Sequence, residues 1–424
     1  MINKLKNIAN TEDKKRLISN FFSLSVLQGV NYLLPLLTLP YLVRVLGVEY
    51  FGLLAFATAM ITYLNIITDY GFNLTATREI SLHRDNKEKV IEIFSSVMSV
   101  KFILVIISFI LLSILVLSFE RFNKDWEIYF LTFGIVIGQA LFPVWLFQGM
   151  EKMKYITYLN ILSKLIFTVA IFIFVKEQND YYIVPMLTSI GFIISGILSL
   201  ILVKKEFKIS FHLQKLKTIK YYFLDSWHVF QQQFYVSMYG PINIVFLGLL
   251  ATDTVVGYYS IVEKILLIPL TVFAMAARAY YPYGVKLYEK NKKLYFSQFK
   301  KISFVYLISS ILFIFIIFLF NKEIVSIITG KTIHNELVDI LNILVFGILF
   351  SSFGGLYTYV FITLKKSKVL NKISFYIMWL NMFFSPLIIN FFGVIGLSYF
   401  IVFRQAIVSG ISYTFISKFK NRKI

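Results

Sequence analysis

The chain has 424 residues, of which 58% are hydrophobic and 15% charged, with a formal net charge of +20 and a mean hydropathy of +0.75. These values lie outside the range of soluble globular domains and indicate an integral membrane protein. Because the sequence contains no cysteine, disulfides, thiol chemistry and cysteine-ligated metals are excluded.

The predicted membrane-spanning helices are long apolar segments bounded by charged residues. One of them, ISFVYLISSILFIFIIFLF (302–320), is long enough to cross roughly 30 Å of hydrocarbon as a helix. The basic N-terminal segment leads into an apolar stretch of about 27 residues, which is too long for the core of a signal peptide and is expected to be the first span. Twelve helices are predicted, at roughly 17–43, 51–73, 95–118, 128–149, 156–175, 181–203, 222–250, 256–281, 302–320, 338–363, 373–391 and 394–418.

The distribution of Lys and Arg predicts the orientation of these helices. With the N-terminus in the cytoplasm, the inner segments hold 31 of the basic residues and the outer loops hold six. The positive-inside rule then places both termini in the cytoplasm. Basic loops beside membrane helices also account for most of the net charge, because anionic lipids attract them, so no nucleic-acid partner is expected.

The predicted cytoplasmic loop at 204–221 divides the spans into two sets of six. GVEYFGLLAF (47–56) and TVVGYYSIVE (254–263) are similar, and each opens the second helix of its half. Such repeats are typical of transporters, whose sites lie between the repeats. We expect an all-α integral membrane protein with two six-helix bundles around a central cavity. The predicted segments are a cytoplasmic N-terminus (1–16), an N-terminal bundle (17–203), a cytoplasmic linker (204–221), a C-terminal bundle (222–418) and a cytoplasmic tail (419–424).

Rows of polar residues at helical spacing mark helix faces that lipid would not tolerate, because unpaired polar groups in hydrocarbon cost several kcal/mol each. The rows are Gln28, Asn31, Pro35 and Thr38 on the first predicted helix, Thr58, Thr62, Asn65, Asp69 and Asn73 on the second, and Asp225, His228, Gln232, Tyr235, Tyr239 and Asn243 on the seventh. They predict a wet cavity where the halves meet. Hydrogen bonds between helices, worth about 0.6 kcal/mol each, are the alternative.

Three cations are predicted near the middle of the membrane: Lys264, Arg404 and Lys164. A charge there costs roughly 2.5 to 3.5 kcal/mol, and lysine rarely snorkels from that depth. We interpret Lys264 and Arg404 as ligand-binding, with structural pairing, for example of Lys264 with Glu263, as the alternative; Lys164 fits either reading. Lys101 lies nearer the cytoplasmic edge and is expected to snorkel. More buried cations than carboxylates suit an anionic ligand such as phosphate.

Arg78 is expected just past the second helix. It forms either a surface ion pair with Glu79, worth at most about 1 kcal/mol, or a functional contact at the mouth of the polar row.

The sequence gives no sign of catalysis. The segment GKT (330–332) lacks the first glycine of a phosphate-binding loop, because Val325 stands in its place. Of the four histidines, His228 alone lies in a predicted span. We expect no enzymatic activity, no cofactor and no metal.

Two motifs resemble a known family. RVLGVEYFG (44–52), which follows a proline-bearing first helix, and DYGFNLTATREIS (69–81) resemble the N-terminal signature of the Wzx-type polysaccharide flippases of the multidrug/oligosaccharidyl-lipid/polysaccharide (MOP) exporter superfamily. The resemblance implies a flippase of the cytoplasmic membrane that moves an undecaprenyl-pyrophosphate-linked oligosaccharide repeat unit, such as that of an O-antigen, outward by alternating access. A polysaccharide polymerase is the implied downstream partner. The first motif adds Arg44 as a contact for the lipid-linked anion, or else as an interfacial anchor.

The candidate residues form two sets. Substrate binding is expected at Arg44, Lys264, Arg404, Arg78, Lys164, Gln28, Asn31 and Gln232, and coupling to an ion, as an alternative to the membrane potential, at Asp69, Asp225 and Glu263. A drug/cation antiporter of the same superfamily is the nearest alternative function and would use buried carboxylates. An integral-membrane polymerase or acyltransferase is a second alternative, which would need a catalytic histidine or a large outer loop.

Overall fold

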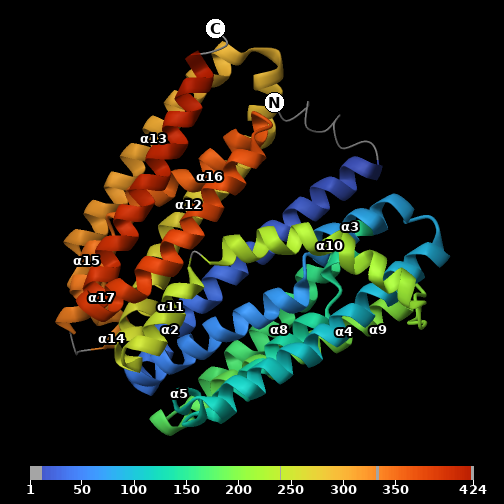
Figure 1. The fold of residues 1–424 in the computed structure, drawn as a ribbon, viewed down its shortest axis with the longest axis horizontal. Helices are drawn as coiled ribbons and strands as arrows, with labels where there is room; N and C mark the ends of the chain where they lie inside the picture. The colour runs from blue at the N-terminus through green and yellow to red at the C-terminus, as the bar shows by residue number, and fades with distance from the viewer. Residues whose placement is uncertain (1–11, 239, 331–333, 422–424) are drawn as a thin grey trace. The chain divides into compact units, whose positions relative to one another are not determined.

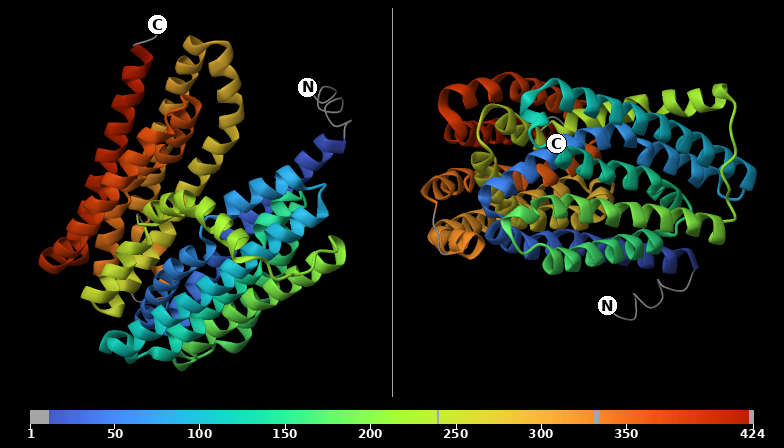
Figure 2. Two further views of the ribbon diagram at one scale, coloured as in Figure 1. Left: turned by 45° about the vertical axis from the view of Figure 1, so that its right-hand side comes forward. Right: turned by 90° about the horizontal axis from the view of Figure 1, so that it is seen from below.

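The computed structural model describes residues 12–238, 240–330 and 334–421, which form helices joined by short connections (Figure 1). Within these ranges there is no β-strand. The chain divides into two compact units, unit 1 with Met1–Tyr41 and Ala57–Phe234, and unit 2 with Leu42–Phe56 and Tyr235–Ile424. In each unit the long helices pack side by side (Figure 2). Residues 1–11 of the expected N-terminal segment and 422–424 of the expected tail lie outside the described ranges.

The helices follow one another along the whole described chain. In order they are α2 (Glu12–Asp69), α3 (Phe72–His83), α4 (Lys87–Ser118), α5 (Glu120–Asn123), α6 (Trp126–Leu141), α7 (Val144–Gly149), α8 (Met153–Phe174), the 3-10 helix η1 (Gln178–Tyr182), α9 (Ile183–Glu206), α10 (Leu216–Ser237), α11 (Pro241–Leu250), α12 (Asp253–Lys290), α13 (Lys292–Leu319), α14 (Asn321–Thr329), α15 (Asn335–Leu344), α16 (Gly347–Thr363) and α17 (Ser367–Asn421).

Long apolar helices dominate both units. In the described part of the chain, eight helices are long and apolar enough to cross a membrane, or ten if the bent pairs α10–α11 and α15–α16 are each one span. Large hydrophobic side chains cover outer helix faces, for example Phe102 on α4 and Phe315 on α13, which are 67% and 62% exposed. The fold is that of an all-α, multi-pass integral membrane protein. The count of twelve spans stays a prediction.

Two glycines interrupt helices where the sequence predicts loops between spans. Gly47 in α2 has φ of 80°, and Gly393 in α17 has φ of 63°. Glycine adopts this left-handed region without the steric cost that a Cβ would bring. The prediction of an outer loop at 44–50 is therefore wrong for most of its length, because the chain is helical there except at Gly47.

The polar rows predicted on the second and seventh helices are both broken. α2 ends at Asp69, and a left-handed turn at Tyr70 and Gly71 leads into α3. Arg78 therefore lies within α3, and the expectation that it lies just past a helix end is wrong. On the seventh predicted helix, α10 and α11 meet at a 58° bend, which separates Asn243 from the rest of the row; Tyr239 lies outside the described residues.

The two units do not follow the predicted bundle boundaries at every point. Residues 42–56 pack with unit 2, and 204–234 pack with unit 1, although the sequence places the division at 204–221. The end of the first predicted span and the beginning of the second thus contribute to the unit that contains most of the C-terminal half. The division into six-helix bundles stays a prediction.

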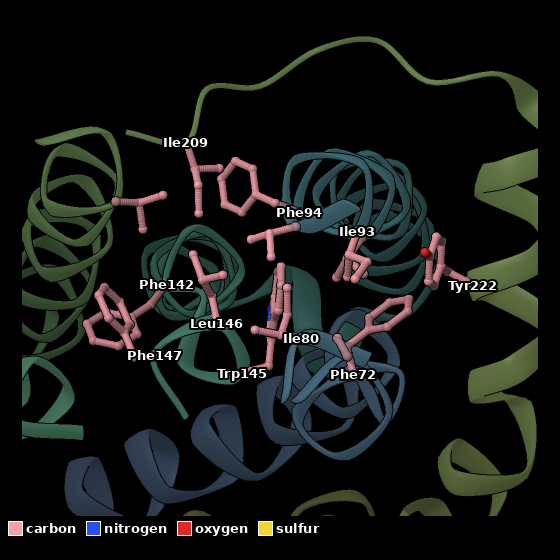
Figure 3. Packing of buried hydrophobic residues seen from close by; sticks show 14 of the residues in the cluster. Phe72, Ile80, Ile93, Phe94, Phe142, Trp145, Leu146, Phe147, Ile209 and Tyr222 are labelled. Carbon is pink, nitrogen blue, oxygen red and sulfur yellow. The ribbon is translucent and has the colours of Figure 1, made fainter. Parts of the chain in front are cut away.

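The core of unit 1 forms where α3, α4 and α7 converge (Figure 3). Ile80 of α3, Ile93 of α4, and Trp145 and Phe147 of α7 are fully buried there. Burying an aromatic or branched side chain of this size contributes about 1.5 to 3 kcal/mol. This core holds α3 and α4 in place and with them the polar residues described below.

In unit 2, the two segments of similar sequence pack against each other. A Cβ atom added at Gly52 would lie 1.8 Å from the carbonyl oxygen of Asp253, and one at Gly257 would lie 2.3 Å from that of Val48. The contact is reciprocal: Gly52 touches Asp253, which is four residues before Gly257, and Gly257 touches Val48, which is four residues before Gly52. Because backbone touches backbone, only glycine fits at either position.

Candidate functional site

Five helices of unit 2 (α11, α12, α15, α16 and α17) line a cavity of about 340 Å³. Its polar lining residues are Asn243, Tyr259, Glu263, Lys264, Ser351, Arg404 and Gln405. The remaining lining residues are leucine, isoleucine and glycine. A mostly apolar wall with a few converging polar groups is typical of ligand sites.

Helical spacing brings the charged side chains to this cavity. On α12, Tyr259 and Glu263 are four residues apart and therefore share one face, with Lys264 directly after them. Arg404 and Gln405 are consecutive on α17, and Arg404 is 6% exposed. Lys264 and Arg404, which the sequence predicts as ligand-binding residues, thus line the same cavity, together with Glu263.

A second cavity of unit 2, about 320 Å³ in volume, lies between α16 and α17. It shares Ser351, Arg404 and Gln405 with the first, so these residues stand where the two cavities meet. Its other polar lining residues carry hydroxyl groups: Tyr357, Thr358, Ser374, Ser409 and Ser412. The combined lining presents one guanidinium group next to a series of neutral hydrogen-bonding groups.

Gln405 is a buried hydrogen-bond acceptor in this shared wall. Its Oε1 atom is buried and receives no hydrogen bond from the residues that the structure describes. A Cβ atom at Gly347 would lie 2.5 Å from that oxygen, so glycine leaves the space beside it. Leaving such a group unsatisfied costs about 1 to 3 kcal/mol, and a hydroxyl or amide donor of a ligand would satisfy it.

In unit 1, by contrast, Lys101 is held by a carboxylate. Its Nζ lies 3.1 Å from Oδ1 of Asp69, and the lysine is 2% exposed. Asn73 donates from Nδ2 to the other carboxylate oxygen of Asp69 at 3.0 Å. The expectation that Lys101 snorkels is wrong, because its ammonium turns inward to a partner 32 residues away in the sequence.

Lys164 of unit 1 also has a partner. Its Nζ donates to Oδ1 of Asn31 at 2.7 Å, so two residues predicted separately as substrate contacts meet each other. Gln28, almost one turn before Asn31 on α2, is half-buried. A charge-assisted hydrogen bond to a neutral amide stabilises the ammonium and leaves its positive charge uncompensated.

Arg78 joins α3 to α10 within unit 1. Its Nη2 lies 3.1 and 2.9 Å from the two carboxylate oxygens of Asp225 and 3.0 Å from Oε1 of Glu79. The arginine side chain is 54% exposed. The sequence predicts the pair with Glu79, but the contact with Asp225, 147 residues away, comes from the fold. Gln232 lies farther along α10 and is exposed.

Arg44 belongs to unit 2 but does not line either of its two cavities. It is exposed, and its guanidinium donates to the carbonyl oxygen of Ile327 on α14. A cation at the C-terminal end of a helix is favourable, because the last carbonyl groups carry partial negative charge. This contact suits the reading of Arg44 as an anchor.

Sequence reasoning missed several lining residues. Tyr259, Ser351 and Gln405 were not predicted, although Tyr259 precedes Glu263 by four residues and Gln405 follows Arg404 directly. A search for polar neighbours of the two predicted residues at helical spacing would have found Tyr259 and Gln405. Ser351 carries no such signal, because α16 meets α17 only through the tertiary fold.

Comparison with known proteins adds the family. The family described as "Polysaccharide biosynthesis protein" matches residues 17–288. A candidate O-antigen transporter of Escherichia coli (strain K12) is 38% identical over 253 residues, which are 60% of this chain and 61% of that protein. A candidate O-antigen transporter of Shigella dysenteriae is 31% identical over 277 residues, 65% of this chain and 69% of that protein. The matched region thus spans less than two thirds of the Escherichia coli relative.

Solved structures share the fold. An inward-facing multidrug resistance MATE family transporter of the MOP superfamily matches with a TM-score of 0.73, over 92% of this chain and 96% of that one, at 14% sequence identity. The lipid II flippase MurJ in an inward closed conformation matches with a TM-score of 0.70, over 95% and 87% of the two chains, also at 14% identity. At this identity the match describes the fold alone.

Proposed function

We propose that this chain, which belongs to the polysaccharide biosynthesis protein family, is a flippase that carries a lipid-linked oligosaccharide repeat unit across the cytoplasmic membrane. The observation that carries the proposal is a pair of adjacent cavities in unit 2: Lys264 and Arg404 line the first, and Arg404 also lines the second, together with a series of hydroxyl groups. The relatives named as O-antigen transporters and the lipid flippase fold support the same reading.

The two cations suit a pyrophosphate. Arginine grips phosphate oxygens with paired N–H groups, whereas lysine acts as a point charge. Two cations and one carboxylate, Glu263, leave a positive excess in the cavity wall. We therefore assign the anionic part of the carrier lipid, an undecaprenyl pyrophosphate in this proposal, to Lys264 and Arg404.

The hydroxyl-lined cavity suits the sugar. Burying a sugar hydroxyl without a partner costs roughly 2 to 7 kcal/mol, so a repeat unit with about ten hydroxyls cannot cross bare hydrocarbon at a useful rate. Side chains such as Thr358, Ser409 and Ser412 both donate and accept hydrogen bonds and would replace water around the glycan. The lipid tail would stay in the bilayer.

The driving force would come from the membrane potential or from an ion. Moving one negative charge outward gains about 2.3 kcal/mol per 100 mV when the inside is negative. Of the three candidate coupling carboxylates, Asp69 and Asp225 form ion pairs with Lys101 and Arg78, whereas Glu263 lines the cavity. Glu263 is therefore our candidate for ion coupling.

Glu263 is also the observation that favours a second function, export of a cationic compound by an antiporter. A buried carboxylate is what such a transporter needs, but here it shares its cavity with two cations. Drug-resistance assays of cells that produce the protein distinguish the two functions. Protection against cationic drugs without any effect on polysaccharide would favour the antiporter.

The test replaces the cavity cations in cells that lack the chromosomal gene. We expect Arg404→Ala and Lys264→Ala to remain in the membrane but to reduce surface polysaccharide about tenfold to a hundredfold, because a hydrogen bond to a charged group contributes about 1.5 to 3 kcal/mol. Lipid-linked oligosaccharide should accumulate in the inner leaflet. Arg404→Lys should restore part of the export.

Lys322→Ala is the matched control, because Lys322 is an exposed cation of the same unit that lines neither cavity. Normal surface polysaccharide from both cavity variants would refute the assignment. An accumulation of lipid-linked units in the outer leaflet would instead indicate that this chain is itself a polymerase. In our proposal, a polymerase is a separate partner that acts after the flippase.

A further inference from the structure

Unit 1 contains a third cavity, which the proposed function does not use. Its volume is about 780 Å³, more than twice that of either cavity in unit 2. Its wall is formed by apolar side chains of α4 and α9, among them Phe94, Met98, Phe102 and Leu200. Apart from Ser99, Lys204 and Ser210, the lining offers no polar side chain, so most of the wall suits a hydrocarbon chain and not a sugar.

The non-helical segment 207–215, between α9 and α10, covers one side of this cavity, and we call it the linker segment. The backbone N–H of His212 donates to Oγ of Ser95 at 3.0 Å, which fixes the segment to α4. Ile209 is buried and points toward Phe94 (Figure 3). Phe211 and Leu213 also line the cavity, yet they are 51% and 88% exposed.

The sequence around this apolar cavity is strongly basic. Residues 204–220 contain six lysines and one acidic residue, Glu206, whose carboxylate accepts a hydrogen bond from the Tyr155 hydroxyl at 2.9 Å. One of the lysines, Lys204, is exposed and lines the cavity itself. Basic side chains beside a gap between membrane helices are typical of sites for anionic lipid headgroups.

We propose that this cavity binds an anionic phospholipid, with an acyl chain between α4, α9 and the linker segment and with the headgroup at Lys204. The apolar wall and the adjacent lysine match the two parts of such a lipid. A single exposed lysine suits one phosphodiester charge, because an ammonium group acts as a point charge without the fixed geometry of arginine. The bound lipid holds the linker segment against α4 and α9. The inference does not depend on the proposed function.

The experiment uses the full chain purified in a mild detergent and examined by native mass spectrometry. We expect one retained phospholipid per chain. After delipidation, the protein should bind phosphatidylglycerol more tightly than phosphatidylcholine. Lys204→Gln should weaken phosphatidylglycerol binding roughly fivefold, the effect of one lysine near an anionic surface.

Two controls test the position of the site. Lys205→Gln changes the neighbouring exposed lysine, which does not line the cavity, and should leave the affinity unchanged. Met98→Trp fills the cavity and should remove the retained lipid, whereas Ile311→Trp, at an exposed residue of α13 in unit 2 that does not line the cavity, should not. Thermal unfolding confirms that each variant is folded, and the exposed position of Lys204 keeps the charge test independent of packing.

Several results would overturn the proposal. They are equal affinity for phosphatidylglycerol and phosphatidylcholine, equal weakening by Lys204→Gln and Lys205→Gln, and retained lipid in Met98→Trp. Displacement of phosphatidylglycerol by a polyprenyl phosphate at equal concentration would assign the cavity to the carrier lipid instead. None of these outcomes depends on export of polysaccharide, so the proposed function is tested separately.

Discussion

The two units treat their intramembrane charges differently. In unit 1, Lys101 is paired with Asp69, Lys164 with Asn31 and Arg78 with Asp225. In unit 2, Lys264, Arg404 and Glu263 line a cavity of about 340 Å³. Both units contain cations in spans, so the presence of a cation alone does not reveal its role.

The difference bears on the proposal that Lys264 and Arg404 face a ligand. A charge in hydrocarbon needs a compensating group, and a protein side chain that supplies it also occupies the coordination positions of the charge. In unit 1, carboxylates of neighbouring helices compensate Lys101 and Arg78, whereas Lys164 has the neutral amide of Asn31 as its partner. The cations of unit 2 lie at a space that also contains hydroxyl groups and a buried, unsatisfied amide oxygen on Gln405.

The largest effect on stability is expected in unit 1, at Lys101. Lys101→Ala leaves the Asp69 carboxylate without its cation and should destabilise the protein by about 3 kcal/mol, at the lower end for a broken buried pair because Asp69 is 27% exposed. Thermal unfolding in detergent measures this change.

The double variant Lys101→Met with Asp69→Leu should recover most of the lost stability, because it removes both charges from the same site. If Lys101→Ala were as stable as the unmodified protein, Lys101 would not differ from the cavity cations, and the contrast between the units would disappear.

A smaller effect, which depends on ligand, is expected at Lys264. Glu263 interacts electrostatically with the Lys264 ammonium, but no ion pair is formed with it in the described ranges, so Lys264→Met should lower the unfolding temperature of the protein alone less than Lys101→Ala does. Farnesyl pyrophosphate should bind about tenfold more weakly to this variant, so that its stabilising effect at saturation falls by about 1.4 kcal/mol. Lys164→Met is the control, because Lys164 donates to Asn31 in unit 1. An equal loss of ligand binding in the control would contradict the assignment.

The smallest effect is expected at Arg78. Arg78→Ala breaks contacts with Asp225 and Glu79, but the arginine is 54% exposed, so the free energy of unfolding should fall by at most about 1 kcal/mol. Because salt screens exposed charges, the difference from the unmodified protein should shrink at high ionic strength. A large effect that persists in high salt would contradict the description of Arg78 as part of an exposed, screened ion pair.

The sequence predicted the fold class and some of the chain interruptions, but not the breaks within the second and seventh predicted helices. Hydropathy sums the transfer free energies of individual residues over a window, so it identifies apolar helices without knowledge of their neighbours. The same local reasoning placed Gly47 and Gly393 in predicted connections. It also singled out Lys264 and Arg404, which line one cavity, although their depth in the membrane stays a prediction.

Only the tertiary structure decided which polar residues meet. Lys164 donates a hydrogen bond to Asn31, 133 residues away in the sequence, and Arg78 donates to Asp225, 147 residues away. Lys101 pairs with Asp69, although the sequence predicts that it snorkels. Gln405 and Ser351 join the cavity because α16 packs against α17. A charge in a span must be compensated, which the sequence reveals, but the compensating group belongs to another helix, and helix packing alone selects it.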